Sequence, residues 1–250
     1  MEGYQDISNT WLVYGFVSCP GKSPLNGLTS RDRRLVVFVL SRSELRLVPH
    51  RFHASLYAVL LAVATGAIRR FHESCGSSFD DPIAGVAIPG AVRRRSADLG
   101  NHVALARVPL PISVAAPIEG FRRIEAFLSD VAGTRGATGL LAAVIARLPV
   151  RMRSRVCRIV VRNISLICAI VSGLPGQRFV ASARVEGIYG TPAHLDEHGV
   201  SFTFVTSQDR VHFSLLSDPH IVEDPDLLMR YVVEATAELV TLASDQQVPA

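Results

Sequence analysis

Long apolar runs are scarce in this sequence of 250 residues, and this bears on where the protein works. The longest run, from Leu56 to Ile68, has 13 residues and contains Thr65 and Gly66. A helix needs about 20 apolar residues to cross a bilayer. The first ten residues are acidic and polar, without the basic start and apolar centre of a secretory signal. We therefore expect no membrane span and a cytoplasmic protein.

Closely spaced cysteines and the common catalytic loops are also missing. The four cysteines lie far apart without a CxxC pair, at Cys19, Cys75, Cys157 and Cys168. This spacing predicts buried thiols rather than a zinc site or a disulfide framework. His194, Asp196 and His198 fall in a loop without a further ligand nearby, so no metal is expected. None of the patterns GxxxxGK(S/T), GxGxxG and GxSxG occurs, which tells against a phosphate-binding loop and a serine hydrolase.

Lysine is almost absent, so the basic balance of the chain comes from arginine. Lys22 is the single lysine among 26 basic residues, and the formal net charge is +4. GC-rich coding produces such a bias without selection for binding nucleic acid, so the charge is weak evidence for that partner. We expect no nucleic-acid partner.

Apolar residues make up 48% of the chain, which predicts a large buried core or an apolar surface meant for a partner. Apolar runs and alternating patterns predict strands at residues 35–40, 84–89, 102–110, 165–172, 180–189, 200–206 and 211–216. Helical spacing predicts helices at residues 54–71, 117–131, 140–162 and 225–242. Because strands and helices interleave, we expect an α/β domain with a mixed sheet over residues 23–250, preceded by an irregular leader at 1–22.

Six motifs occur in an order that matches a known family. They are SPLNG at 23–27, LLAVATGAIRRF at 60–71, Gly100-Asn101 before a strand that ends in LP, SGLPG at 172–176, ASARVEGIYGTPAHLD at 181–196 and SDPHIVEDPDLL at 217–228. From Ser23 onward the chain resembles the C-terminal half of the bacterial wax ester synthase/acyl-CoA:diacylglycerol acyltransferase (WS/DGAT) family. The resemblance assigns motif or structural roles to Pro24, Leu25, Asn26, Gly27, Gly100, Asn101, Ser172, Pro175, Gly176 and Asp224.

The resemblance implies a fold and a reaction. It implies one lobe of a chloramphenicol-acetyltransferase-like (CoA-dependent acyltransferase) fold, in which two α/β lobes enclose a substrate channel. The reaction would transfer an acyl group from long-chain acyl-CoA, as co-substrate, to diacylglycerol or a fatty alcohol, without a further cofactor. In the family, an HHxxxDG box in the N-terminal lobe supplies the histidine that takes the proton from the alcohol. A positioned imidazole accelerates such a step by roughly 10²–10⁴-fold.

The HHxxxDG box does not occur in these 250 residues. The one HxxxD pattern runs from His220 to Asp224 and is flanked by Pro219 and Pro225 rather than by His and Gly. We expect Asp224 to cap the helix that follows and His220 to be structural. His102 is expected to be a residue of the strand after Gly100-Asn101. No catalytic residue is therefore predicted, and a separate N-terminal lobe would supply the base.

Three departures from the family pattern leave a second hypothesis open. Tyr57 and Ala58 replace an Asn-Asp pair, Gly173 replaces the Asn of SNVPG, and residues 206–209 replace a Ser-Tyr-x-Gly turn. Motif asparagines of this kind are expected to hold the interface between the lobes by hydrogen bonds. The alternative to a second enzyme lobe is a non-catalytic lipid- or protein-binding module, or a decayed remnant of such an enzyme.

Four arginines share one narrow stripe of the predicted 140–162 helix. They are Arg151, Arg155, Arg158 and Arg162. Such a stripe suits contact with anionic lipid or the phosphates of CoA, and with it a peripheral position on a membrane or lipid droplet. The alternative is an arginine face exposed to solvent.

Overall fold

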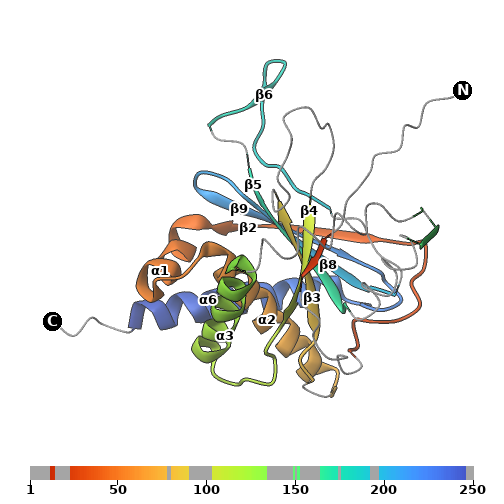
Figure 1. Cartoon of the computed structure of the whole chain (residues 1–250). Coiled ribbons are helices and arrows are strands. Elements are labelled where there is room, and N and C mark those ends of the chain that lie inside the picture. The colour runs from red at the N-terminus through yellow and green to blue at the C-terminus, as the bar shows by residue number, and fades with distance from the viewer. Residues whose placement is uncertain are drawn as a thin grey trace, which may run out of the picture.

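The computed structural model describes residues 12–14, 23–77, 80–89, 103–133, 149, 151–152, 164–173, 176–191 and 197–245. Labels follow Figure 1. The elements are β1 (Leu12–Tyr14), β2 (Arg34–Ser41), α1 (Arg42–Phe52), α2 (Leu56–Ser74), β3 (Ile83–Pro89), β4 (Val103–Pro109), α3 (Pro117–Gly133), β5 (Leu166–Ser172), β6 (Phe179–Val180), β7 (Ala183–Arg184), β8 (Val200–Thr206), β9 (Arg210–Ser217) and α6 (Pro225–Asp245).

Seven of these strands form one mixed sheet in the order β1-β4-β3-β5-β8-β9-β2. Neighbouring strands run parallel in β1–β4, β3–β5 and β5–β8 and antiparallel in β3–β4, β8–β9 and β9–β2. The carboxyl ends of β5 and β8 therefore lie at the same edge of the sheet, beside the tight turn that leads into β9. The predicted α/β architecture with a mixed sheet is confirmed.

Helices α1, α2, α3 and α6 gather on one face of the sheet (Figure 1). Alternate residues of the central strands point into this layer because side chains of a strand alternate between its faces. Phe202 and Phe204 of β8 pack on Phe213 of β9, with ring centroids 5.4 and 4.7 Å apart. Helix α2 is mostly buried; Ser55 caps its start, and Gly76 follows its end in a left-handed conformation at φ +61°.

On the other face of the sheet, a chain segment covers the central strands, whereas the edge strand β2 is exposed to solvent. The segment around Gly190 crosses β8 and β9, and the Ser214 hydroxyl donates a hydrogen bond to the Gly190 carbonyl. At the β2 edge the same face exposes Leu35, Val37 and Val39, which are 52%, 45% and 36% accessible. The sheet therefore ends in an eight-residue strand with apolar side chains open to solvent.

Two predicted segments differ from the structure. Within the expected leader, Leu12–Tyr14 forms β1, which pairs with β4, so residues 1–22 are not irregular throughout. A three-residue strand gives no periodic signal and forms only because the β4 edge is available for pairing. Residues 180–189, predicted as one strand, instead contribute to the two-residue pair β6 and β7 and then continue outside the main sheet. This segment projects from the body of the molecule in Figure 1.

The remaining helices agree with the predictions in part. Helix α1 was not predicted, and Pro49 inside it is a residue that usually ends a helix. The predicted helix at 140–162 lies almost wholly outside the described residues. None of the described helices is long and apolar enough to span a membrane alone. Helices α1 and α2 reach that length together but are bent by 107° at the break between them.

Candidate functional site

The motif at residues 23–27 ties together the starts of two parallel strands. The Asn26 side-chain amide donates to the carbonyls of Ile164, at 3.2 Å, and Glu197, at 3.1 Å. The Gly27 N–H donates to the same Glu197 carbonyl at 3.3 Å, and Leu25 is fully buried. Because Ile164 and Glu197 precede β5 and β8, the motif fixes the amino ends of both strands. Pro24 is half-buried beside it.

The motif at residues 172–176 lies at the opposite end of β5. The Gly173 N–H donates to the Thr206 carbonyl at 2.7 Å. A Cβ on Gly173 would lie 2.6 Å from that oxygen, so only glycine allows this approach. Ser172 is exposed at the end of β5, and Gly176 has a φ of +74°, which favours glycine. Residues 174–175, with Pro175, are outside the described residues.

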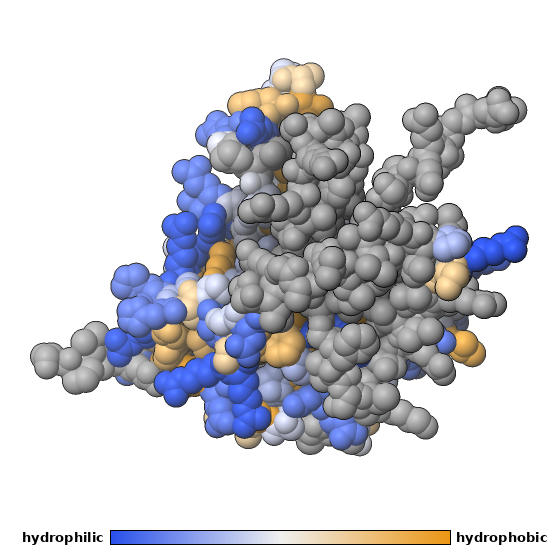
Figure 2. Space-filling view, in the orientation of Figure 1, coloured by the Kyte–Doolittle hydropathy of each residue, from blue (hydrophilic) through white to orange (hydrophobic). Residues whose placement is uncertain are grey.

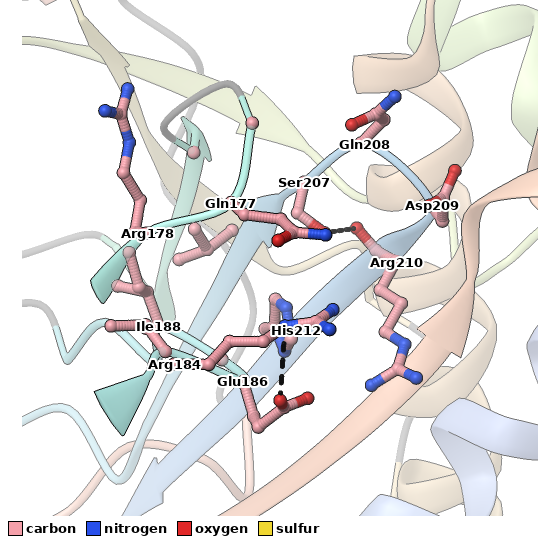
Figure 3. Close-up of a pocket in the computed structure, with 15 residues that line it drawn as sticks. Gln177, Arg178, Arg184, Glu186, Ile188, Ser207, Gln208, Asp209, Arg210 and His212 are labelled. Carbon is pink, nitrogen blue, oxygen red and sulfur yellow. Dashed lines mark hydrogen bonds and ion pairs between the residues drawn. The ribbon is translucent and has the colours of Figure 1, made fainter. Parts of the chain in front are cut away.

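A cavity of about 240 Å³ lies at this end of the sheet (Figure 3). Its floor is formed by β8 and β9, and its walls by the loop at 176–178, the segment from β7 to Ile188 and the turn at 207–209. A second cavity, of about 300 Å³, adjoins it and shares Gly173, Gly176, Ser207 and Gln208. Arg42 and Ser172 line the second cavity. The two together form a hollow that runs along the carboxyl ends of β5 and β8.

His212 is the buried polar side chain in this cavity. It is 4% accessible, and its Nδ1 has no hydrogen-bond partner in the described part of the chain. Tyr189 contacts the ring edge-on at a centroid distance of 5.2 Å. A Cβ on Gly187 would lie 3.0 Å from Nδ1, so the glycine lets the backbone pass over the imidazole. Burial and the charge of Arg210 lower the pKa of His212 below its usual 6.5, so the imidazole is neutral at pH 7.

Arginine dominates the charged groups that line the cavity. Arg184 Nε lies 3.3 Å from Glu186 Oε1, and both side chains are largely exposed. Arg178 and Arg210 form no ion pair within the described residues. Asp209 is the second acidic residue in the lining. With three arginines and two acids, the lining has a formal charge of +1.

A known protein family matches the part of the chain that contains most of this site. The family described as the WS/DGAT C-terminal domain matches residues 99–240. The chain belongs to the WS/DGAT family. The predicted resemblance is thereby confirmed, and this WS/DGAT domain includes β5, β8, β9 and the cavity between them.

Individual relatives agree in fold and in extent. A protein of Mycobacterium tuberculosis named probable diacylglycerol O-acyltransferase is 24% identical over 240 residues, which are 93% of this chain and 52% of that protein. The wax ester synthase/diacylglycerol acyltransferase from Marinobacter aquaeolei VT8 superposes with a TM-score of 0.70 at 16% identity, over 90% of this chain and 52% of that one.

A condensation domain that releases the chain of the enacyloxin polyketide synthase has the same fold. It superposes with a TM-score of 0.57 at 14% identity, over 92% of this chain and 45% of that one. The predicted acyltransferase-type fold is therefore confirmed. The chain spans about half the length of the relatives that it matches.

The structure gives physical roles to two of the three departures from the family pattern, those at 57–58 and 173. The Tyr57 hydroxyl donates to the Ile170 carbonyl of β5 at 2.7 Å, so a hydrogen bond between α2 and the sheet is present at the position of the family asparagine. Burial raises the pKa of Tyr57, with a smaller contribution from Cys168. Ala58 is fully buried, and Gly173 allows the contact with Thr206 described above.

The other predicted residues that the structure describes do not line the cavity. Asp224 Oδ1 accepts a hydrogen bond from the Leu227 N–H at 3.0 Å, in the geometry of an N-cap of α6. His220 is exposed, with Nδ1 3.7 Å from buried Asp218. Arg151 is exposed. The rest fall outside the described residues: Gly100, Asn101, His102, Arg155, Arg158, Arg162, His194 and Asp196.

Cysteines and metal ligands give no further site in the described residues. Burial raises the pKa of the Cys168 thiol to about 12, which makes it unreactive near neutral pH. Cys75 is exposed, so the prediction of a buried thiol is wrong there. It is the C-cap residue of α2, at the exposed end of the helix. No group of three His, Cys, Asp or Glu side chains suited to a metal occurs within the described ranges.

Sequence reasoning missed the groups that meet in the cavity. Arg210 and His212 lie two residues apart on β9 and so share one face of the sheet, a signal that the sequence contains. Arg178, Arg184 and Glu186 come from the segment that was predicted as part of a strand. They line the same cavity as His212 because this segment folds back over β9. No local sequence pattern predicts such a fold.

Proposed function

We propose that this WS/DGAT domain is the second lobe of an acyl-CoA-dependent O-acyltransferase that esterifies diacylglycerol or a long-chain alcohol. An N-terminal lobe, outside these 250 residues, supplies the histidine that activates the hydroxyl. Triacylglycerol or wax ester is then the product, and the domain alone is inactive. The observation that carries this proposal is the open β2 edge, where apolar side chains are exposed next to a hollow at the strand ends.

Two groups of exposed apolar side chains are candidates for the surface that a second lobe covers. One is the β2 edge, with Leu35, Val37 and Val39. The other is the projecting β6–β7 segment, where Phe179 and Val180 are 58% and 70% accessible. Figure 2 shows hydrophobic surface at the top of the view, where β6 lies in Figure 1. Exposed groups of this size are unfavourable in water and are typical of surfaces that bind a partner.

The reaction accounts for the need for two lobes. An alcohol is a weak nucleophile at neutral pH and needs a positioned base to take its proton. His212 is buried against Gly187 and Tyr189, and His220 is on the surface away from the cavity. Neither has the position of a base facing a bound alcohol. The domain's part in the reaction is to form one wall of the channel and to hold the acyl donor, whose chain contributes about 0.8 kcal/mol per buried CH₂.

Reconstitution tests the proposal. The purified chain is mixed with the histidine-bearing N-terminal lobe of a WS/DGAT relative, and labelled acyl-CoA and diacylglycerol or hexadecanol are supplied. We expect a complex by size exclusion and an ester product that needs both partners. Absence of both complex and product would favour the non-catalytic module instead. Ester formed by the chain alone would place the base within these 250 residues and refute the division of roles.

Acyl acceptors of this kind reside in lipid, so we also expect the domain to work at a lipid surface as a peripheral protein. Arg151, the described member of the predicted arginine stripe, is exposed, and a cationic stripe of this kind favours anionic head groups. Flotation with vesicles of phosphatidylglycerol, compared with vesicles of phosphatidylcholine, measures this. Equal recovery with both would show that the domain has no preference for anionic lipid.

A further inference from the structure

The geometry points to a pH-sensitive strap at residues 186–190, which covers β8 and β9 on the face away from the helices at neutral pH and lifts from them in mild acid. The inference goes beyond the proposed function, because the motion belongs to this chain alone and needs no second lobe. The strap also contributes to one wall of the cavity at the strand ends. When the strap lifts, this wall of the cavity opens.

Two glycines bring the strap into close contact with polar side chains of the sheet. A Cβ on Gly187 would lie 3.0 Å from His212 Nδ1, and a Cβ on Gly190 would lie 2.9 Å from Thr203 Cγ2. His212 and Thr203 are 4% and 3% accessible. Neither His212 Nδ1 nor Thr203 Oγ1 has a hydrogen-bond partner within the described residues. The covered state thus leaves two polar atoms without a partner, and water satisfies both once the strap has moved.

Few interactions hold the strap against the sheet. The Ser214 hydroxyl donates to the Gly190 carbonyl, and Tyr189 contacts the His212 ring edge-on. Among the described residues, no backbone–backbone hydrogen bond joins the strap to a strand. Ile188 and Tyr189 are 42% and 39% accessible, so both remain partly in water. Segments with few buried contacts and an exposed backbone open at a low cost in free energy.

His212 makes the opening depend on pH. Burial lowers the pKa of the covered imidazole, and the charge of Arg210, two residues away on β9, lowers it further. Uncovering the ring removes the burial, so the pKa returns toward its usual 6.5. The open state therefore binds a proton more readily than the closed state does. As the pH falls below 6.5, protonation favours the open strap, whereas at higher pH the neutral imidazole stays covered.

The other groups around His212 do not reverse this sign. In the register of the sheet, its neighbours on β2 and β8 are Val39 and Val205, which carry no charge. The further charged groups of the cavity lining are two arginines and two acids, namely Arg178, Arg184, Glu186 and Asp209. Arg184 Nε lies 3.3 Å from Glu186 Oε1, so these two charges compensate each other (Figure 3). Burial therefore remains the main influence on the covered imidazole.

The surface beneath the strap continues into the exposed face of β2. In the pairing of β2 with β9, Val37 lies opposite Ser214 and Val39 lies opposite His212. Both valines are exposed. An open strap therefore connects the cavity at the strand ends with the apolar face of β2, and a closed strap separates them.

Labelling of a cysteine beneath the strap measures the opening in the whole chain. Thr203→Cys places a thiol under Gly190, and Cys168, which is fully buried on the helical face of β5, reports opening of the core in the same molecule. The probe is N-ethylmaleimide, and each rate is divided by the rate of the urea-unfolded chain at the same pH. At pH 7.5 the introduced thiol should react at least about tenfold faster than Cys168. Between pH 7.5 and 5.5 its normalised rate should rise by up to about tenfold, the factor that an open-state pKa of about 6.5 supplies.

Substitutions in the Thr203→Cys chain separate the titration from the anchor of the strap. His212→Phe keeps an aromatic ring against Tyr189 and should abolish the rise in acid. His50→Gln, at an exposed position of α1, is the matched control and should leave the rise unchanged. Ser214→Ala removes the hydrogen bond to the strap and should increase the rate about 2- to 10-fold at both pH values. Ser244→Ala, which loses a hydrogen bond within α6, should not change the rate.

Three outcomes would overturn the inference. One is labelling of the introduced thiol no faster than Cys168, which would mean that only unfolding of the core exposes it. Another is a normalised rate that is the same at pH 7.5 and 5.5. The third is a rise in acid that persists in His212→Phe and so comes from another group.

A measurement on the unsubstituted chain supports the labelling. The imidazole of His212 is titrated by NMR, with His212→Phe to assign its signal, and its midpoint should lie below 6.5. A midpoint at or above 6.5 would remove the cause of the pH dependence. Neither measurement uses acyl-CoA or a second lobe. A failed reconstitution would therefore leave the strap in place, and an immobile strap would leave the proposed function in place.

Discussion

Replacing the exposed apolar residues of β2 tests where the second lobe binds. The triple substitution Leu35→Thr, Val37→Thr and Val39→Thr places β-branched residues, which favour a strand, at all three positions. Full burial of such a side chain contributes about 1.5–3 kcal/mol. Scaled by the accessible fractions of 52%, 45% and 36%, covering all three contributes about 2–4 kcal/mol to binding.

Threonine retains one methyl group, so the substitution removes about half of this contribution. We expect the Kd for the histidine-bearing lobe to rise by about 5- to 30-fold, which corresponds to about 1–2 kcal/mol. Titration calorimetry or analytical ultracentrifugation measures the change. The unfolding free energy of the isolated chain should also fall, by about 1–2.5 kcal/mol, because roughly half of each side chain is buried within the chain itself, so binding is measured where both proteins are folded.

A matched control separates the β2 edge from apolar surface in general. Leu47 on α1 is 49% accessible, close to the 52% of Leu35, and lies in the helical layer, so Leu47→Gln removes an equally exposed leucine elsewhere. Its Kd should equal that of the wild type. If the triple variant binds the second lobe as tightly as the wild type does, the β2 edge is not the contact surface and the reasoning from its exposure fails.

Three further predictions concern parts that support the site. Gly173→Ala should lower the unfolding free energy by about 2–4 kcal/mol in chemical denaturation, because its Cβ would meet the Thr206 carbonyl at 2.6 Å and disturb their hydrogen bond. Gly120→Ala, with 3.7 Å to its nearest neighbour, should cost far less. Tyr57→Phe should cost about 1 kcal/mol by the same assay, since the hydrogen bond to β5 is lost; an unchanged midpoint would contradict this. Asp218 makes the stability of the fold depend on pH. Burial alone raises the pKa of its carboxyl group, but hydrogen bonds from His220 and Ser30 and the charge of Arg33 outweigh burial. The folded pKa therefore lies below 3.8. Its contribution to the unfolding free energy is therefore complete above pH 3.8 and is lost as the pH falls through the lower folded pKa. Unfolding midpoints measured from pH 6 to 2 should fall less steeply in Asp218→Asn than in the wild type.

Local patterns were sufficient to predict most of the sheet and its helices. The strands β3, β5, β8 and β9 are short apolar runs between turn residues, and each was predicted within about two residues. The helices α2, α3 and α6 have apolar residues at helical spacing and end or begin at residues that favour such positions. These signals are local because side chains point to the same face every two residues in a strand and every three to four residues in a helix.

Other features depend on tertiary contacts and left no such signal. Strand β1 forms only by pairing with β4, and the β6–β7 segment folds back at residues with positive φ such as Ala181. The apolar run LVVFVL of β2 predicted a strand correctly, but its position at an open edge follows from the sheet order. The cavity was missed for the same reason, since Arg178 and His212 line one cavity only after the chain has crossed β9.

Formation of ester by the combined lobes is the most direct test of the central claim. Equimolar chain and histidine-bearing lobe are incubated with labelled acyl-CoA and diacylglycerol, beside each component alone and beside a partner lobe whose second box histidine is replaced by alanine. We predict that triacylglycerol forms only in the incubation that contains both intact lobes. Product from the chain without its partner, or from the pair that lacks the histidine, would contradict it.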